Sequence, residues 1–249
     1  MARMNPMSLL CRWPRAAGIV LVLLSVPALY AATPPLSDSM EQRLAACTSC
    51  HGAHGAGSPE DTRIPRLAGK PAAYLRQQLE YFRTGKRHHA AMEYVVRQLS
   101  PDYLNRIAAY FASQEVPVHR HPVPALPAEV LARGEQLVRH GDPARGVPSC
   151  QSCHGERLTG VQPMMPGLAG LTYDYIRTQL TLWRSNGRTD EGMFCMGVVA
   201  NRMRPGDIQA VSAWLAGQPA PPDMRPLASR DEAEPLPGWC VLGHAGANP

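Results

Sequence analysis

The run CTSCH at residues 47–51 decides the fold of this chain, and its pattern returns as CQSCH at residues 150–154. Two cysteines three positions apart can bond to the two vinyl groups of one haem, and the adjacent histidine can then bind the iron. A pattern of this kind seldom occurs twice by accident. The repetition therefore predicts two covalently bound haem c groups, attached through Cys47, Cys50, Cys150 and Cys153, with His51 and His154 as proximal iron ligands.

Three other uses of these cysteines fit the sequence less well. One zinc ion would need its two Cys-x-x-Cys pairs about 15 to 20 residues apart, whereas Cys47 and Cys150 are 103 apart. A thioredoxin-like redox pair would lie in a βαβ setting, and the flanking segments have helical patterns instead. A plain disulfide across each pair would leave the adjacent histidines unexplained.

The N-terminus has the pattern of a secretory signal peptide. Basic residues precede an apolar run at residues 16–29, which is short for a membrane span, and small residues follow it. We predict a signal peptide over residues 1–31, with cleavage after Ala28 or Ala31, and the alternative is an uncleaved anchor, against which Pro27 counts. Export to the periplasm supplies the compartment in which haem is attached to thiols and disulfides form.

Charge and the remaining cysteines narrow the function further. The formal charge of +5 includes the three arginines of the signal peptide, and the small positive remainder is not that of a nucleic-acid-binding protein. Cys11 leaves with the signal peptide, so Cys195 and Cys240 remain. In an oxidising compartment they either form a disulfide or stay as two buried free thiols.

The sequence contains two copies of one unit. IPRLAG at residues 64–69 matches MPGLAG at 165–170, and YLRQQL at 74–79 matches YIRTQL at 175–180. In both units apolar residues then follow at helical spacing, which predicts an amphipathic helix. Gly85 and Gly187 are expected to end these two helices.

Further helices are predicted at the beginning and end of each unit. The opening helices are expected at residues 39–46 and 128–139. The closing helices begin near Pro101 and Pro205, at the first helical position, and carry Tyr110 and Trp214 at equivalent places as core aromatics. We therefore predict an all-α protein of two tandem cytochrome c-like domains, each a small helical bundle around its haem.

The predicted domain boundaries follow from composition. The first domain covers residues 36–115 and the second residues 128–217. Between them, residues 116–127 contain four prolines and should form a stiff, exposed linker. Residues 218–249 are rich in proline and charge and should form an irregular tail, tied back by Cys240.

The repeat also selects the sixth iron ligands. Met92 follows His51 by 41 residues and precedes Tyr110 by 18, while Met196 follows His154 by 42 and precedes Trp214 by 18. This shared register favours Met92 and Met196 over the neighbouring Met164, Met165 and Met193. His88 and His89 are rivals for the first iron, but the second unit has no histidine at their place.

Other residues are candidates for the surroundings of the haems. The carbonyls of Pro65 and Pro166 are placed to accept the second ring proton of each haem histidine, which would fix its orientation. Arg83 and Arg184 occupy equivalent helix ends and either pair with haem propionates or are solvated charges. His54 and His140 have no counterpart in the repeat and are expected to be surface groups.

Together these motifs resemble the di-haem cytochromes c4, from about Leu44 to Gly217. In that family two similar domains pack with their haems close together, and the proteins sit in the periplasm, soluble or at the membrane face. The resemblance implies that they carry electrons to terminal oxidases or from dehydrogenases. The tail beyond Gly217, with Cys195 and Cys240, departs from the family pattern and leaves the partner open.

The predicted function is single-electron transfer between redox proteins of a respiratory chain, with no small-molecule substrate and no catalytic residues. One alternative is a cytochrome subunit of a dehydrogenase complex. A less favoured one is a di-haem peroxidase, which needs one iron open to peroxide, and the two matched methionines argue against it.

Overall fold

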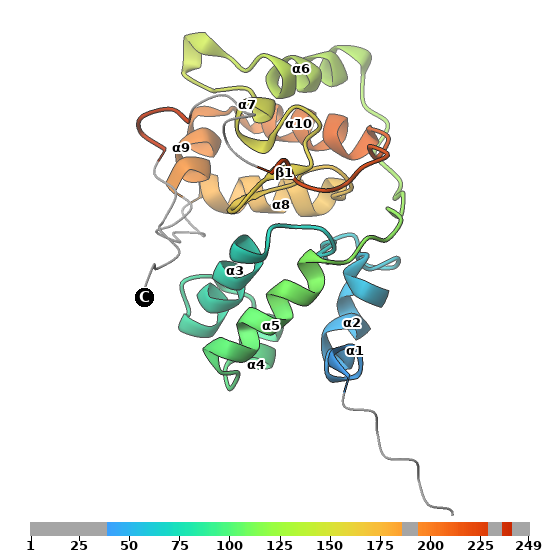
Figure 1. Cartoon of the computed structure of the whole chain (residues 1–249). Helices are drawn as coiled ribbons and strands as arrows, with labels where there is room; N and C mark the ends of the chain where they lie inside the picture. The colour runs from blue at the N-terminus through green and yellow to red at the C-terminus, as the bar shows by residue number, and fades with distance from the viewer. Residues whose placement is uncertain (1–38, 186–193, 229–235, 241–249) are drawn as a thin grey trace, which may run out of the picture. The chain divides into compact units, whose positions relative to one another are not determined.

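The computed structural model describes residues 39–185, 194–228 and 236–240. They belong to one compact unit, Ser37–Pro249, and their regular structure is helical except for one short hairpin. Figure 1 shows the chain coloured from blue at its N-terminus to red at its C-terminus. The all-α prediction is confirmed, and the predicted signal peptide lies outside the described residues.

From residue 39 on, where the structure is described, the first half contains five α-helices and one 3-10 turn, η1, at Ala53–Gly55. The predicted opening helix at residues 39–46 is wrong, because fully buried Leu44 interrupts it with non-helical backbone angles (φ −92°, ψ 8°). The run CTSCH instead forms the end of the second helix. The helices are α1 (Met40–Arg43), α2 (Ala45–His51), α3 (Ala72–Thr84), α4 (Ala90–Val96) and α5 (Pro101–Ala112).

The α-helices of the second half follow in the same order, but its 3-10 turn lies before the helix that carries CQSCH instead of after it, and a hairpin is added. A hairpin of β1 (Gly160–Val161) and β2 (Met165–Pro166) pairs Gly160 with Pro166 in antiparallel register. The opening helix has the predicted bounds. The elements are α6 (Ala128–Arg139), η2 (Pro143–Arg145), α7 (Cys150–His154), α8 (Tyr173–Arg184), α9 (Phe194–Arg202) and α10 (Pro205–Gly217).

The opening and closing helices of the second half pack closely. A Cβ atom added to Gly134 of α6 would lie 2.3 Å from the carbonyl oxygen of Ala210 in α10, so only glycine allows this crossing. Trp214 of α10 is 9% exposed, and the guanidinium of Arg139 lies over its ring. The predicted core role of Trp214 is confirmed.

The matching position in the first half is more polar. Tyr110 is half-buried and meets Phe111 edge-on. Its hydroxyl lies 3.3 Å from Nδ1 of His54. His54 is therefore not an isolated surface group. Gly55 beside it lies close to α5, since a Cβ atom there would meet the ring of Phe111 at 2.7 Å.

The C-terminal tail is attached to the second half at two places. Leu227 donates its backbone N–H to Gly160 and accepts one from Gln162, both at 2.9 Å. Cys240 forms a disulfide with Cys195 of α9, which decides between the two alternatives that the sequence left open. The described part of the tail contains no helix, and the sequence analysis did not foresee the hydrogen bonds of Leu227.

Candidate haem-binding sites

Helix α2 carries the first set of predicted residues. Cys47 is half-buried, Cys50 is exposed, and His51 is 8% exposed. The ring Nδ1 of His51 lies 2.9 Å from the carbonyl oxygen of Pro65, as the sequence predicts. Burial lowers the pKa of His51, against the opposite effect of that hydrogen bond, and so favours the neutral imidazole, the form that binds a metal.

Helix α7 places the second set in the same way. His154 is 5% exposed, and its Nδ1 lies 2.7 Å from the carbonyl oxygen of Pro166. Because Pro166 belongs to β2, the hairpin holds this acceptor in place. Burial raises the pKa of the Cys150 thiol to about 12, and Cys153 adds to the effect.

Both predicted methionine ligands lie on short helices that the sequence analysis did not foresee. Met92 is in α4 and Met196 is in α9. Each is half-buried and packs against the apolar core. In the sequence, the only signal for these two helices was that each methionine precedes the aromatic residue of its closing helix by the same number of residues.

In the second half the four predicted residues face one cavity. Its empty volume is about 900 Å³, which includes space open to solvent, and its walls are mainly apolar. Two thiols, an imidazole and a thioether around an apolar cavity are the donors and surroundings that a covalently bound haem needs, so these residues fit the group. The walls include Cys150, Cys153, His154, Met196, Leu180 and Trp183, and also Lys70 and Tyr74 of the first half.

The two predicted arginines have protein partners. Arg83 forms an ion pair with Glu80 at 2.6 Å, and Arg184 donates to the carbonyl oxygen of Met203 at 2.5 Å. Neither contact indicates that the arginine pairs with a haem propionate. Arg87 instead joins the two halves, because it donates to Gln78 at 2.7 Å and to Gln179 at 2.9 Å.

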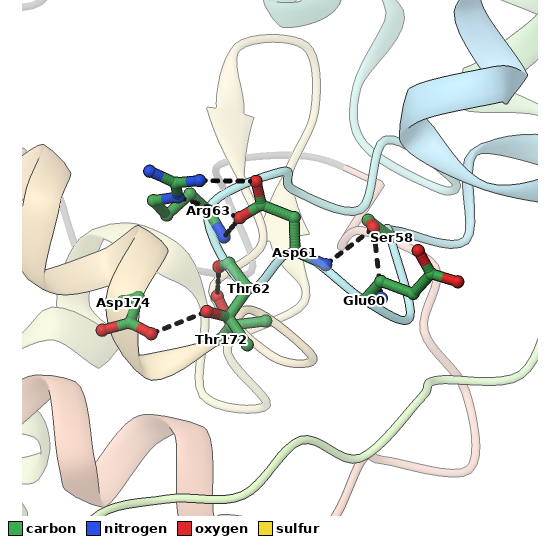
Figure 2. Close-up of polar contacts among 7 residues, drawn as sticks. All are labelled: Ser58, Glu60, Asp61, Thr62, Arg63, Thr172 and Asp174. Atoms are coloured by element: carbon green, nitrogen blue, oxygen red, sulfur yellow. Dashed lines mark hydrogen bonds and ion pairs between the residues drawn. The ribbon is translucent and has the colours of Figure 1, made fainter.

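Further polar contacts between the halves surround Thr62. Its hydroxyl donates to a carboxylate oxygen of Asp174 at 2.6 Å, and its carbonyl oxygen accepts a hydrogen bond from Thr172. Figure 2 shows both contacts beside the ion pair of Asp61 and Arg63. The sequence analysis missed these residues, because the repeat relates the halves without showing which of their surfaces meet.

Comparisons with known proteins agree with this geometry. The cytochrome c family model matches residues 41–115. The chain is 37% identical over 198 residues to the thiosulfate dehydrogenase electron acceptor of Thiomonas intermedia, covering 80% of this chain and 87% of that protein. It is 35% identical over 179 residues to cytochrome c4 of Pseudomonas aeruginosa, covering 71% and 86%.

Solved structures give the same result. The structure of reduced cytochrome c4 from Pseudomonas stutzeri matches with a TM-score of 0.63 and 32% identity, covering 71% of this chain and 95% of that one. Thiosulfate dehydrogenase from Marichromatium purpuratum matches with a TM-score of 0.62 and 35% identity. This second match covers 70% of our chain but only 36% of that longer chain.

The fold, the attachment runs and these matches define a c-type cytochrome that binds haem c covalently and carries electrons. Its two halves are tandem cytochrome c domains. The chain belongs to the cytochrome c4 family. Within the described residues, no helix has both the length and the apolar character that a membrane span requires.

Proposed function

We propose that this protein is a di-haem electron carrier with one His/Met-ligated haem in each half. Cys47 and Cys50 would hold the first haem, and Cys150 and Cys153 the second. His51 with Met92 and His154 with Met196 would bind the two irons. The observation that carries the proposal is the meeting of two thiols, an imidazole and a thioether around one apolar cavity, in a chain that repeats the same set.

Each group of residues has a defined part in this function. A bound haem supplies a one-electron couple. The carbonyl of Pro166 fixes the ring of His154, so that its other nitrogen can point into the cavity. The apolar walls limit the access of water. A thioether favours the reduced iron, so Met92 and Met196 as ligands would raise the reduction potential.

The rival ligands of the first iron are less suitable. The side chain of His88 is 74% exposed, and its Nδ1 lies 3.3 Å from a Glu93 oxygen. His89 precedes α4 and is also exposed. Met92 is the candidate that packs against the core, which supports the choice made from the repeat.

We further propose that the protein works in the periplasm after removal of residues 1–31. The two haem domains would be residues 36–115 and 128–217, joined by the linker at 116–127 and followed by the tail at 218–249. The described part of the linker chain has no regular structure. In each half three helices follow the attachment run, α3 to α5 in the first and α8 to α10 in the second. These observations support the proposed boundaries.

For the electron donor we propose a dehydrogenase of the thiosulfate-oxidising kind. The similarity to two proteins described as thiosulfate dehydrogenase electron acceptors, at 37% and 32% identity, supports this choice. The protein would be the electron-accepting partner and not the site of substrate oxidation. A terminal oxidase as the acceptor stays a prediction from the family resemblance.

Haem content and ligation test the proposal together. We expect two haem equivalents per chain in a pyridine haemochrome assay. Met92→Leu and Met196→Leu should each remove about half of the far-red absorption band of methionine-ligated ferric haem, because each opens one iron. Each variant should also gain carbon monoxide binding at that iron.

Met164→Leu is the matched control, since Met164 is buried but outside the proposed ligand set. It should leave the band unchanged. A single haem equivalent, or a band that survives both ligand variants, would contradict the proposal. Rapid reduction by a thiosulfate dehydrogenase supplied with thiosulfate would support the donor, and peroxide turnover by the wild-type protein would favour the peroxidase alternative.

A further inference from the structure

A lysine of the first half reaches the haem cavity of the second half. Lys70 follows the turn at Gly69, and its side chain is buried, with 8% of the residue exposed. Its Nζ donates to the carbonyl oxygen of Gly167 at 2.8 Å. Lys70 also lines the cavity that contains Cys150, His154 and Met196. The lysine therefore spans the contact between the two halves.

The partner of Lys70 belongs to the turn that orients the proximal histidine. Gly167 directly follows Pro166, whose carbonyl oxygen lies 2.7 Å from Nδ1 of His154. This turn has little room to move, because a Cβ atom on Gly167 would lie 2.5 Å from the carbonyl oxygen of Thr159. A hydrogen bond to Gly167 thus restrains the residues behind His154.

A second buried cation lies on the same loop. Arg66 is 3% exposed and donates to the carbonyl oxygens of Pro117 at 2.9 Å and Val116 at 2.7 Å. Its Nε is buried without a hydrogen-bond partner among the described residues. Among the described residues no carboxylate pairs with Arg66 or with Lys70.

No carboxylate of the described residues therefore balances the positive charge at Lys70. Burial lowers the pKa of Lys70 to about 7, and the charge of Arg66 adds to the effect. A buried cation is costly unless a negative group accompanies it. A haem carries two carboxylates, which are negative groups of the required kind.

The repeat shows that only the first half has this pair of buried cations. Arg66 and Lys70 align with Gly167 and Leu171 of the second unit. The first half therefore supplies a lysine to the cavity of the second half, whereas the matching residue of the second half, Leu171, is apolar and lines the cavity of its own half. The two haem sites are unequal in charge although their attachment runs and proposed ligands match.

We propose that Lys70, a residue of the first half, is a positioning residue for the haem of the second half. It holds the Pro166–Gly167 turn behind His154, and in its protonated form it raises the reduction potential of that haem by its positive charge. In a low dielectric a nearby cation disfavours oxidised iron, which carries one more positive charge than reduced iron. This inference rests on the proposed di-haem function.

The test is a redox titration of the full-length haem-loaded protein, followed by visible spectroscopy. Lys70→Met should reduce the equilibrium constant for reduction of one haem by about tenfold and change the other haem less. The affected haem should be the one whose spectrum changes in Met196→Leu. Lys86→Met is the matched control, because it removes the same charge from an exposed lysine of the first half.

Two further variants separate charge from folding. Lys70→Arg keeps the charge and should restore most of the wild-type potential. Lys70→Gln keeps a hydrogen-bond donor without the charge and should lower the potential as Lys70→Met does. If both neutral variants titrate like Lys86→Met, the inference is wrong. If the wild-type protein lacks two methionine-ligated haems, the proposed function itself fails, which the haem assay shows separately.

Discussion

At the scale of single residues, both halves orient a histidine with the carbonyl of a proline. The distances from His51 to Pro65 and from His154 to Pro166 are 2.9 and 2.7 Å. Proline suits this place because it has a carbonyl acceptor and no competing N–H donor. The two acceptors lie on different local structures, since only Pro166 is part of a hairpin.

Position 134 has no room for a side chain, and glycine occupies it. In Gly134→Ala the new methyl group would meet the carbonyl of Ala210 at 2.3 Å and Cβ of Trp214 at 2.8 Å. We expect a loss of about 1 to 3 kcal/mol in the free energy of unfolding, measured by urea denaturation.

Gly206→Ala is the control for this substitution. It is the same change in α10, and nothing lies within 4 Å of the added Cβ. This variant should be as stable as the wild type or slightly more stable, because alanine favours a helix. Equal stability of the two variants would show that α6 can move away from α10 at little cost.

At the scale of elements, α9 is held by the tail. The disulfide joins Cys195, which is adjacent to Met196, to Cys240 across 45 residues of chain. Trp239 beside this cysteine also packs under the guanidinium of Arg202 on α9. The proposed ligand Met196 is therefore on a helix that the C-terminal segment restrains.

Removing the disulfide should destabilise the protein. Cys240→Ser removes a cross-link that restricts the conformations of the unfolded chain. We therefore expect a loss of about 2 to 4 kcal/mol in the free energy of unfolding. Denaturant unfolding under non-reducing conditions measures it. Wild-type protein treated with a reductant should show the same loss, and a variant as stable as the wild type would mean that the tail does not constrain α9.

At the scale of the whole molecule, polar contacts join the two halves. The hydrogen bonds of Thr62, Lys70 and Arg87 all cross from the first half to the second. Such bonds are directional, so they fix one arrangement of the halves more narrowly than apolar contact does. A fixed arrangement also suits electron exchange between two proposed haems.

Thr62→Val tests this contact while keeping the shape of the side chain. It removes the donor to Asp174, and we expect a loss of about 1 to 2 kcal/mol in the free energy of unfolding, followed by urea denaturation. Thr84→Val is the control, since Thr84 is exposed and donates to Glu80 of its own helix. If the two variants lose the same amount, the contact between the halves adds nothing to stability.

The sequence by itself determined the class of protein, the two attachment runs and the main helices. These follow from local signals: the spacing of cysteines and histidine, apolar residues at helical intervals, and prolines at helix starts. The bounds of α6 and the start of α10 were found in this way. The repeat extended the prediction to Met92 and Met196, because equal intervals are visible without a structure.

Only the tertiary structure decided which distant residues meet. It interrupted the opening helix at Leu44, paired His54 with Tyr110, joined Cys195 to Cys240 and placed Lys70 in the cavity of the other half. The last three are contacts between residues 45 to 97 positions apart, separations over which sequence spacing carries no information. A repeat makes two halves alike, whereas their packing brings different residues of each into contact, and so makes them unequal.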